Sequence, residues 1–197
     1  MTEPVDQMPD GDEQHEPDPG MVLAAGVVIY GAMGTTALFW LWMRDRMDAL
    51  PAASVGEFGP WVSSFVGLVV GLIGAGVLGW ALRRYVGLQE VASVAQRLFS
   101  TAGERIGIAF VLISAVAEEL FFRLAVQDAF GLLGSVAFYV LLNSSVGGLR
   151  WLAFTFSHAL VLGLIVHLGF GLLGSTTAHA ILNYLSLRRT QLQGISS

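Results

Sequence analysis

The feature that most constrains this chain is a pair of long apolar segments that carry no charged side chain. They run from Met21 to Met43 and from Trp61 to Leu82, and arginines follow each of them directly. Because a helix that crosses the bilayer needs about 20 apolar residues, both segments are long enough to do so. The composition agrees, since 54% of the 197 residues are hydrophobic and only 13% are charged. These values predict an integral membrane protein and exclude an ordinary soluble domain.

The net charge of −5 comes from the first 20 residues. They hold seven acidic residues, four prolines and no lysine or arginine, so we expect a disordered acidic tail over residues 1–20. The remaining chain holds all ten arginines and eight acids, and this balance suggests no nucleic-acid partner. The chain has no cysteine, which excludes disulfides, thiolate metal sites and cysteine nucleophiles.

Residues 106–187 are also apolar, but polar residues and glycine divide them into shorter pieces. With the two long segments they predict an all-α, polytopic membrane bundle of about six transmembrane helices. The sequence Gly-Leu-Leu-Gly-Ser begins at residues 131 and 171, and we interpret it as a shared turn at two helix starts. The four further helices are expected over residues 106–129, 132–145, 151–168 and 173–187.

Two connecting segments and the domain division complete this prediction. Residues 44–60, with Pro51 and Pro60, are expected to form a loop. Residues 87–105 place apolar side chains at helical spacing, which predicts an amphipathic helix in the membrane interface or an ordinary amphipathic connector. The resulting division is a tail over 1–20, two transmembrane helices and the interfacial helix over 21–104, a catalytic helix bundle over 105–190 and a C-terminal tail over 191–197.

The arginines predict the orientation of the bundle. Six spans place both termini on one side, together with seven of the ten arginines, whereas the other side holds Arg44 and Arg46. Because positive residues are retained in the cytoplasm, we expect both termini to be cytoplasmic in a multi-pass protein of the plasma (inner) membrane.

The predicted helix over residues 106–129 carries three charged residues, Glu118, Glu119 and Arg123. Such groups are costly inside a membrane and therefore indicate function. Glu119 and Arg123 are four positions apart, the favourable order for an ion pair on one helix face. Glu118 lies about 100° further round the helix and has no such local partner. The Glu119 carboxylate thus suits a structural role, and the Glu118 carboxylate is available for catalysis.

The last two predicted helices carry His158 with Phe154, and His179 with Asn183, each pair four positions apart on one face. Counting 1.5 Å per residue from the arginines at the expected cytoplasmic helix ends, Arg105, Arg150 and Arg188, the side chains of Glu118, His158 and His179 lie about 20, 12 and 14 Å deep, near the middle of the bilayer. Three polar groups at similar depth on three helices fit a single buried site. His167 lies on the face opposite His158 and is not expected to join it.

A carboxylate beside a histidine can deprotonate water, and a second histidine with an asparagine amide can stabilise an oxyanion. This set predicts hydrolysis of a peptide bond within the membrane. Glu118, His158 and His179 are also an acceptable zinc set, although the HExxH pattern is absent. Ser157 faces away from His158 and is a poor nucleophile candidate. The alternative is that these polar groups only join helices to one another.

The same residues resemble three motifs of the CPBP family of intramembrane proteases, which includes type II CAAX prenyl endopeptidases and bacterial Abi proteins. Glu118-Glu119-…-Arg123 resembles EExxxR, Phe154-…-His158 resembles FxxxH, and His179-…-Asn183 resembles HxxxN. The resemblance covers residues 105–187. It implies that Glu118 and His158 activate water, that His179 and Asn183 stabilise the oxyanion, and that Glu119, Arg123 and Phe154 support the site.

The family has been described both as glutamic and as metalloproteases, and we expect the metal-independent mechanism, with zinc as the alternative. His158 and His179 are only 21 positions apart, shorter than the family pattern, which suggests a compact branch similar to the myxosortases. The resemblance implies a protein or peptide substrate with a membrane-anchored or lipidated C-terminal segment. The competing reading is a non-catalytic member of the family that acts as an immunity factor or partner-binding scaffold; a transporter is weaker, because paired broken helices are lacking.

Overall fold

The computed structural model describes residues 18–85, 104–144 and 148–194, and their secondary structure consists of helices joined by short turns, with no strand. The expected all-α class is therefore confirmed for these parts of the chain. These helices include one short 3-10 turn, Met47–Ala49, and two π-helical segments, Leu120–Val126 and Val166–Phe170. The elements are α1 (Pro19–Met43), η1 (Met47–Ala49), α2 (Leu50–Val55), α3 (Gly59–Arg84), α5 (Glu104–Glu119), η2 (Leu120–Val126), α6 (Gln127–Asn143), α7 (Leu149–Ile165), η3 (Val166–Phe170) and α8 (Gly171–Gly194).

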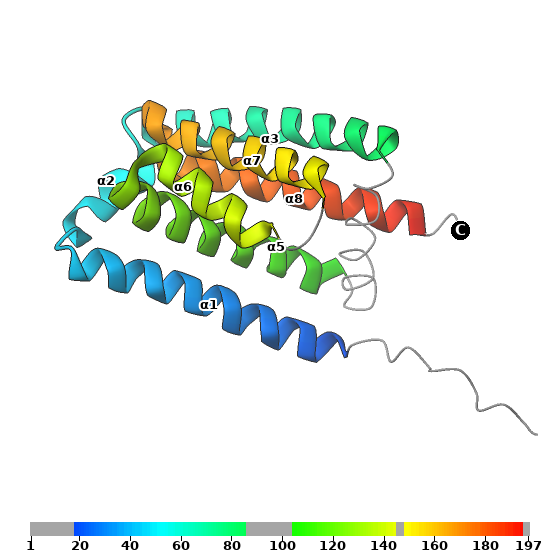
Figure 1. Ribbon diagram of the computed structural model, residues 1–197, viewed down its shortest axis with the longest axis horizontal. Helices are drawn as coiled ribbons and strands as arrows, with labels where there is room; N and C mark the ends of the chain where they lie inside the picture. Colours follow the sequence, from blue (N-terminus) through cyan, green and yellow to red (C-terminus); the bar gives the residue numbers. More distant parts are fainter. Residues whose placement is uncertain (1–17, 86–103, 145–147, 195–197) are drawn as a thin grey trace, which may run out of the picture.

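The long helices lie side by side in one bundle, with α8 near its centre (Figure 1). α3, α5 and α7 all pack on α8, α1 packs on α5 and η2, and α6 packs on α7 and η2. α1 begins and α8 ends at the same end of the bundle (Figure 1). We call this the arginine-rich end, because α3, α5, α7 and α8 carry arginines there.

Three helical segments are long and apolar enough to cross a membrane, which is fewer than the six that we expected. They are Leu23–Met43, Gly59–Arg84 and Leu149–Arg189. The last contains α7 and α8, which lie antiparallel, so this one apolar stretch is a helical hairpin (Figure 1). α5 and α6 have only 16 and 17 residues, which is why neither is long enough to qualify by itself. The fold supports a membrane helix bundle with three candidate spans.

Glycines set the breaks between the C-terminal helices, as the sequence predicted. Gly131 has φ 72° and ψ 179° and interrupts α6 directly before Leu132, the expected start of a helix. Gly171, at the start of α8, has nearly the same conformation, φ 63° and ψ −177°. Because L side chains disfavour positive φ, glycine permits both turns. The interpretation of Gly-Leu-Leu-Gly-Ser as a shared turn is therefore confirmed.

The connection between α1 and α3 is not simply the loop that we expected, because it folds into η1 and α2. Pro51 lies in the first turn of α2 and Pro60 in the first turn of α3, where proline costs no intrahelical hydrogen bond. Gly56, with φ 74°, ends α2 and lies against Gly169 and Gly171. Two prolines thus mark helix starts here rather than a structureless segment.

The remaining expectations concern the chain ends and the segment before α5. The predicted interfacial helix lies outside the described residues, apart from its last two positions, which begin α5. Asp18 caps α1, since its side chain accepts a hydrogen bond from the Gly20 backbone N–H at 2.8 Å. At the other end α8 continues to Gly194, past the expected helix boundary.

The interior combines apolar clusters with an unusual share of polar side chains. Phe122, Val136, Tyr139 and Ala159 form one buried cluster between η2, α6 and α7. Beside it lie buried Glu119, Arg123, Ser135, Ser175 and His179. Buried polar groups require hydrogen-bond partners, so their contacts define the centre of the fold.

Candidate active site

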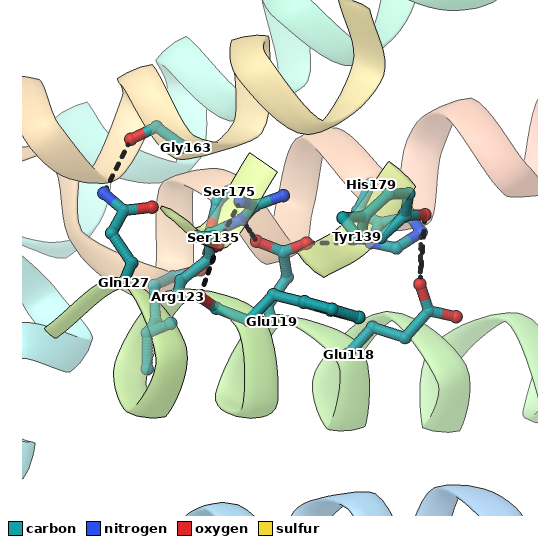
Figure 2. A network of polar contacts seen from close by, with 11 residues as sticks. Glu118, Glu119, Arg123, Gln127, Ser135, Tyr139, Gly163, Ser175 and His179 are labelled. Atoms are coloured by element: carbon teal, nitrogen blue, oxygen red, sulfur yellow. Dashed lines mark hydrogen bonds and ion pairs between the residues drawn. The ribbon is translucent and has the colours of Figure 1, made fainter. Parts of the chain in front are cut away.

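The first pair of the polar cluster is Glu119 with Arg123, both fully buried. Arg123 Nε lies 3.2 Å from Glu119 Oε2, so the ion pair that the spacing predicted is formed. Arg123 Nη1 also donates to Ser135 Oγ of α6 at 3.1 Å, and Ser135 donates to the Phe122 carbonyl at 2.7 Å (Figure 2). These contacts tie η2 to α6 through the interior.

Glu119 also fixes His179, which reaches it from α8. Glu119 Oε1 lies 3.0 Å from His179 Nδ1 (Figure 2). An ionised carboxylate can only accept a hydrogen bond, so in that state of Glu119 the imidazole proton lies on Nδ1. This arrangement leaves His179 Nε2 directed to the other side of the ring, towards Glu118.

Glu118 occupies a different environment from its neighbour, because 17% of its side chain is exposed whereas Glu119 is fully covered. Tyr139 of α6 donates a hydrogen bond to Glu118 Oε2 at 3.2 Å. The same oxygen lies 3.9 Å from His179 Nε2 (Figure 2). Tyr30 of α1 lies close enough to interact with Glu118 and with Ser114. The carboxylate that we expected to be free is thus oriented by groups on other helices.

His158 completes the cluster from α7. Its ring packs edge-on against His179 with centroids 4.9 Å apart, and it stacks on Phe154 at 5.9 Å. The predicted packing of Phe154 beside His158 is therefore present. The ring of Tyr139 lies beside the His158 ring as well, with centroids 5.9 Å apart. Among the described residues neither ring nitrogen of His158 has a hydrogen-bond partner, so both are free to bind a ligand.

The structure brings Glu118, His158 and His179 together and leaves three other residues weighed in the sequence analysis apart from them. Asn183 is half-buried one turn beyond His179 on α8, and it makes no polar contact with this cluster in the described part of the chain. His167 is exposed in η3, away from the site as expected. Ser157 bonds to the Ala153 carbonyl within its own helix at 2.8 Å.

Four residues of the site were not found from the sequence: Tyr30, Ser135, Tyr139 and Gln127. Ser135 and Tyr139 are four positions apart on α6, so their spacing placed both on one face. Nothing in the sequence indicated that this face meets Glu118 and Arg123. Gln127 lies one turn beyond Arg123 and donates to the Gly163 carbonyl of α7 at 3.0 Å (Figure 2).

No set of three histidine, aspartate or glutamate side chains in the described residues is arranged to hold a metal ion. The His158 and His179 rings meet at 77°, and one nitrogen of His179 already contacts Glu119. As placed here, Glu118, His158 and His179 are not grouped as the ligands of one metal ion, and zinc stays the alternative to the metal-independent mechanism that we predict.

What the cluster can do chemically follows from these positions. It offers a partly accessible carboxylate, a histidine fixed by a buried carboxylate–arginine pair, and a second histidine with free nitrogens. Such a set can bind and deprotonate a water molecule. Comparison of the chain with family models, with curated proteins and with solved structures finds no match. The resemblance to the CPBP family therefore rests on its three short motifs.

Proposed function

We propose that this chain is an intramembrane endopeptidase that hydrolyses a peptide bond of a membrane-associated protein. The observation that carries the proposal is the separation of Glu118 Oε2 from His179 Nε2, 3.9 Å. Two polar atoms at this distance are too far apart for a direct hydrogen bond and suit a bridging water. His158, with its nitrogens unoccupied in the described structure, adjoins the same place.

The energetic cost of this cluster supports a catalytic role. Ionisable groups at the centre of a membrane helix cost about 2.5–3.5 kcal/mol each on insertion scales. The ion pair of Glu119 with Arg123 already joins η2 to α6 and α8, so helix association does not require Glu118 as well. Because the Glu118 carboxylate is not required for helix association, we attribute its presence to a catalytic role.

In the proposed reaction Glu118 takes a proton from the bound water as its oxygen attacks the scissile carbonyl carbon. The carbonyl electrons move to the oxygen, and His179 Nε2, when protonated, donates a hydrogen bond to this oxyanion. The C–N bond then breaks, and Glu118 returns the proton to the leaving amine. Glu119 and Arg123 act as positioning residues, since they hold the His179 ring through Nδ1.

The roles that we propose for His158 and His179 differ from those that the family resemblance implies. His179, rather than His158, has the nitrogen nearest to Glu118. We therefore assign His158 to holding the water or the substrate from the α7 side. Asn183 lies one turn from His179 on α8, which suits a second oxyanion donor to a substrate lying along that helix.

We extend the proposal to the membrane topology. The six long helical segments α1, α3, α5–η2, α6, α7 and α8 would each cross the bilayer, with the arginine-rich end in the cytoplasm. The short α5 and α6 rely on neighbouring helices or on local thinning of the membrane. The substrate would be a protein with a membrane-anchored or lipidated segment, processed in the inner membrane.

The test is cleavage of membrane-anchored reporter proteins by the purified enzyme in vesicles, with Glu118→Gln as the variant. We expect Glu118→Gln to lower the cleavage rate by at least about a hundredfold, since a general base contributes roughly 10²–10⁴-fold. Glu104→Gln is the matched control, because Glu104 pairs with Arg188 on the surface at 2.8 Å. This control is expected to cleave at the wild-type rate.

Retained cleavage by Glu118→Gln, with the protein inserted and folded, would overturn the assignment of the base. No cleavage by the wild type, with a cellular phenotype that survives Glu118→Gln, would support the non-catalytic scaffold instead. Elemental analysis separates the mechanisms: stoichiometric zinc that is lost in a His158→Ala, His179→Ala double variant would replace the glutamic mechanism with a metal-dependent one.

A further inference from the structure

A groove runs between α3 and α7 and leads to His158. It has a volume of about 220 Å³, and α8 forms its floor. We call it the α3–α7 groove. The lining residues that matter below are Val70, Gly74 and Val77 of α3, His158 and Val161 of α7, and Leu182 of α8.

The groove exists because α3 and α7 both pack on α8 but not closely on one another. α3 can lie close to α8 because Gly71 has no side chain: a Cβ there would lie 2.8 Å from the Ala178 carbonyl oxygen. Gly74 lets Leu182 of α8 lie close to α3, since a Cβ there would come within 2.9 Å of Leu182 Cδ1. Both glycines line the groove, and the close approach that they allow brings α8 up to form its floor.

The chemistry of the groove is apolar, with His158 as its reactive polar group. The hydroxyl of Ser157, which also lines it, is bonded to the Ala153 carbonyl of the same helix. At the outer rim Val77 is 58% exposed and Val161 is 42% exposed. Both belong to candidate membrane spans, so the groove opens towards the side of the bundle that lipid would cover. A ligand that reaches His158 this way must therefore be apolar and membrane-embedded.

We propose that the α3–α7 groove receives one bulky apolar side chain, aromatic or branched aliphatic, of a membrane-embedded peptide, next to the bond that is cleaved. This inference rests on the proposed function. The size fits, because an apolar cavity of roughly 150 Å³ is sufficient to bind benzene. The groove therefore selects substrates by side-chain size, favouring Phe or Leu over Ala at the position beside the scissile bond.

The test narrows the groove from both walls with Val77→Phe and Val161→Phe. The probes are two single-span reporter proteins that differ only in carrying Phe or Ala at the selected position. We expect wild type to cleave the Phe reporter about tenfold or more faster in kcat/KM, as apolar pockets discriminate by this order. Each narrowed variant is expected to lose this preference while still cleaving the Ala reporter.

Val69→Phe is the matched control. Val69 is exposed on the same helix as Val77 but does not line the groove, so its replacement is expected to leave the preference unchanged. Equal preference in wild type and in both narrowed variants would overturn the groove assignment and leave the protease proposal standing.

A second measurement does not depend on cleavage and uses the absence of native cysteine. In the Glu118→Gln background, single cysteines at Val161 and Val69 are oxidised with a reporter that has cysteine at the selected position. We expect a disulfide-linked complex at Val161 and none at Val69. If no reporter is cleaved by wild type but this cross-link forms, the groove is supported and the endopeptidase is not. Equal cross-linking at both positions overturns the groove.

Discussion

Glu118 and Glu119 are adjacent in sequence, but their surroundings differ, so each suits a different role. Glu119 is fully enclosed and contacts both Arg123 and His179, so each of its oxygens has a partner. Glu118 is partly exposed and meets Tyr139 and, at a longer distance, His179. A buried carboxylate with a partner on each oxygen suits a structural role, whereas a partly exposed one has room to accept a hydrogen bond from water.

Replacing Arg123 by methionine tests the structural role of the Glu119–Arg123 ion pair. Arg123→Met keeps the approximate side-chain volume but leaves the buried Glu119 carboxylate without its cation. Breaking one partner of a buried ion pair costs about 3–5 kcal/mol. We expect a drop of this size in the free energy of unfolding, measured by denaturant titration in detergent micelles. The double variant Glu119→Gln, Arg123→Met is expected to regain much of it, and unchanged stability in the single variant would contradict the assignment.

At the scale of elements, the contact of α3 with α8 depends on small residues. Ser63, Gly67, Gly71, Ala75 and Gly79 recur every four positions on α3 and are its buried residues. A Cβ on Gly67 would collide with the Gly174 carbonyl of α8. Without a hydrophobic effect inside the membrane, such close backbone approach is a main source of helix association.

Gly67→Ala and Gly76→Ala form a matched pair for this contact. Both glycines are on α3, but a Cβ on Gly76 meets nothing within 4 Å. We expect Gly67→Ala to lower the free energy of unfolding by about 1–3 kcal/mol, the usual cost of overpacking. Gly76→Ala is expected to be neutral or stabilising, because alanine favours helix over glycine by about 1 kcal/mol. Equal stability of the two variants would show that the α3–α8 contact tolerates a side chain.

The π-helical η2 connects the site residues of α5 with those of α6. It follows directly after Glu119 and carries Arg123, so the wider turn lies between the end of α5 that carries Glu118 and Glu119 and the start of α6. π-helical turns concentrate at functional sites. Here the element directs Arg123 at once to Glu119 and to Ser135 on the next helix.

At the scale of the whole molecule, the charges at the two ends of the bundle differ. The arginine-rich end carries pairs on α3 and α8 and single arginines on α5 and α7. At the opposite end Arg44 and Arg46 both bind Asp128, at 2.6 and 2.9 Å. Among the described arginines six lie at the arginine-rich end and two at the opposite end, and this is the asymmetry on which orientation depends.

Single cysteines test this orientation, since the chain has none of its own. Gly148→Cys lies at the arginine-rich end before α7, and Ala52→Cys lies on α2 at the opposite end; both positions are exposed. In intact cells we expect a membrane-impermeant maleimide to label Ala52→Cys, and to label Gly148→Cys only after permeabilisation. The reverse pattern would place the arginine-rich end outside the cytoplasm.

The spacing of residues along the sequence was sufficient to predict features that lie within a single helix. The ion pair of Glu119 with Arg123 and the packing of Phe154 on His158 follow from residues four positions apart. The turns at Gly131 and Gly171 follow from the backbone freedom of glycine. In the loop over residues 44–60, by contrast, the prolines that suggested irregular structure begin two helices, because proline is tolerated in a first turn.

By itself the sequence determined the helical class, the membrane setting and the list of polar residues that could act, because hydropathy and helix periodicity are local properties. Only the tertiary structure decided which side chains meet: Tyr139 against Glu118, His158 edge-on to His179, and the α3–α7 groove beside them. The physical reason is that these contacts join different helices. Their geometry depends on rotations and crossing positions that the packing of the whole bundle sets.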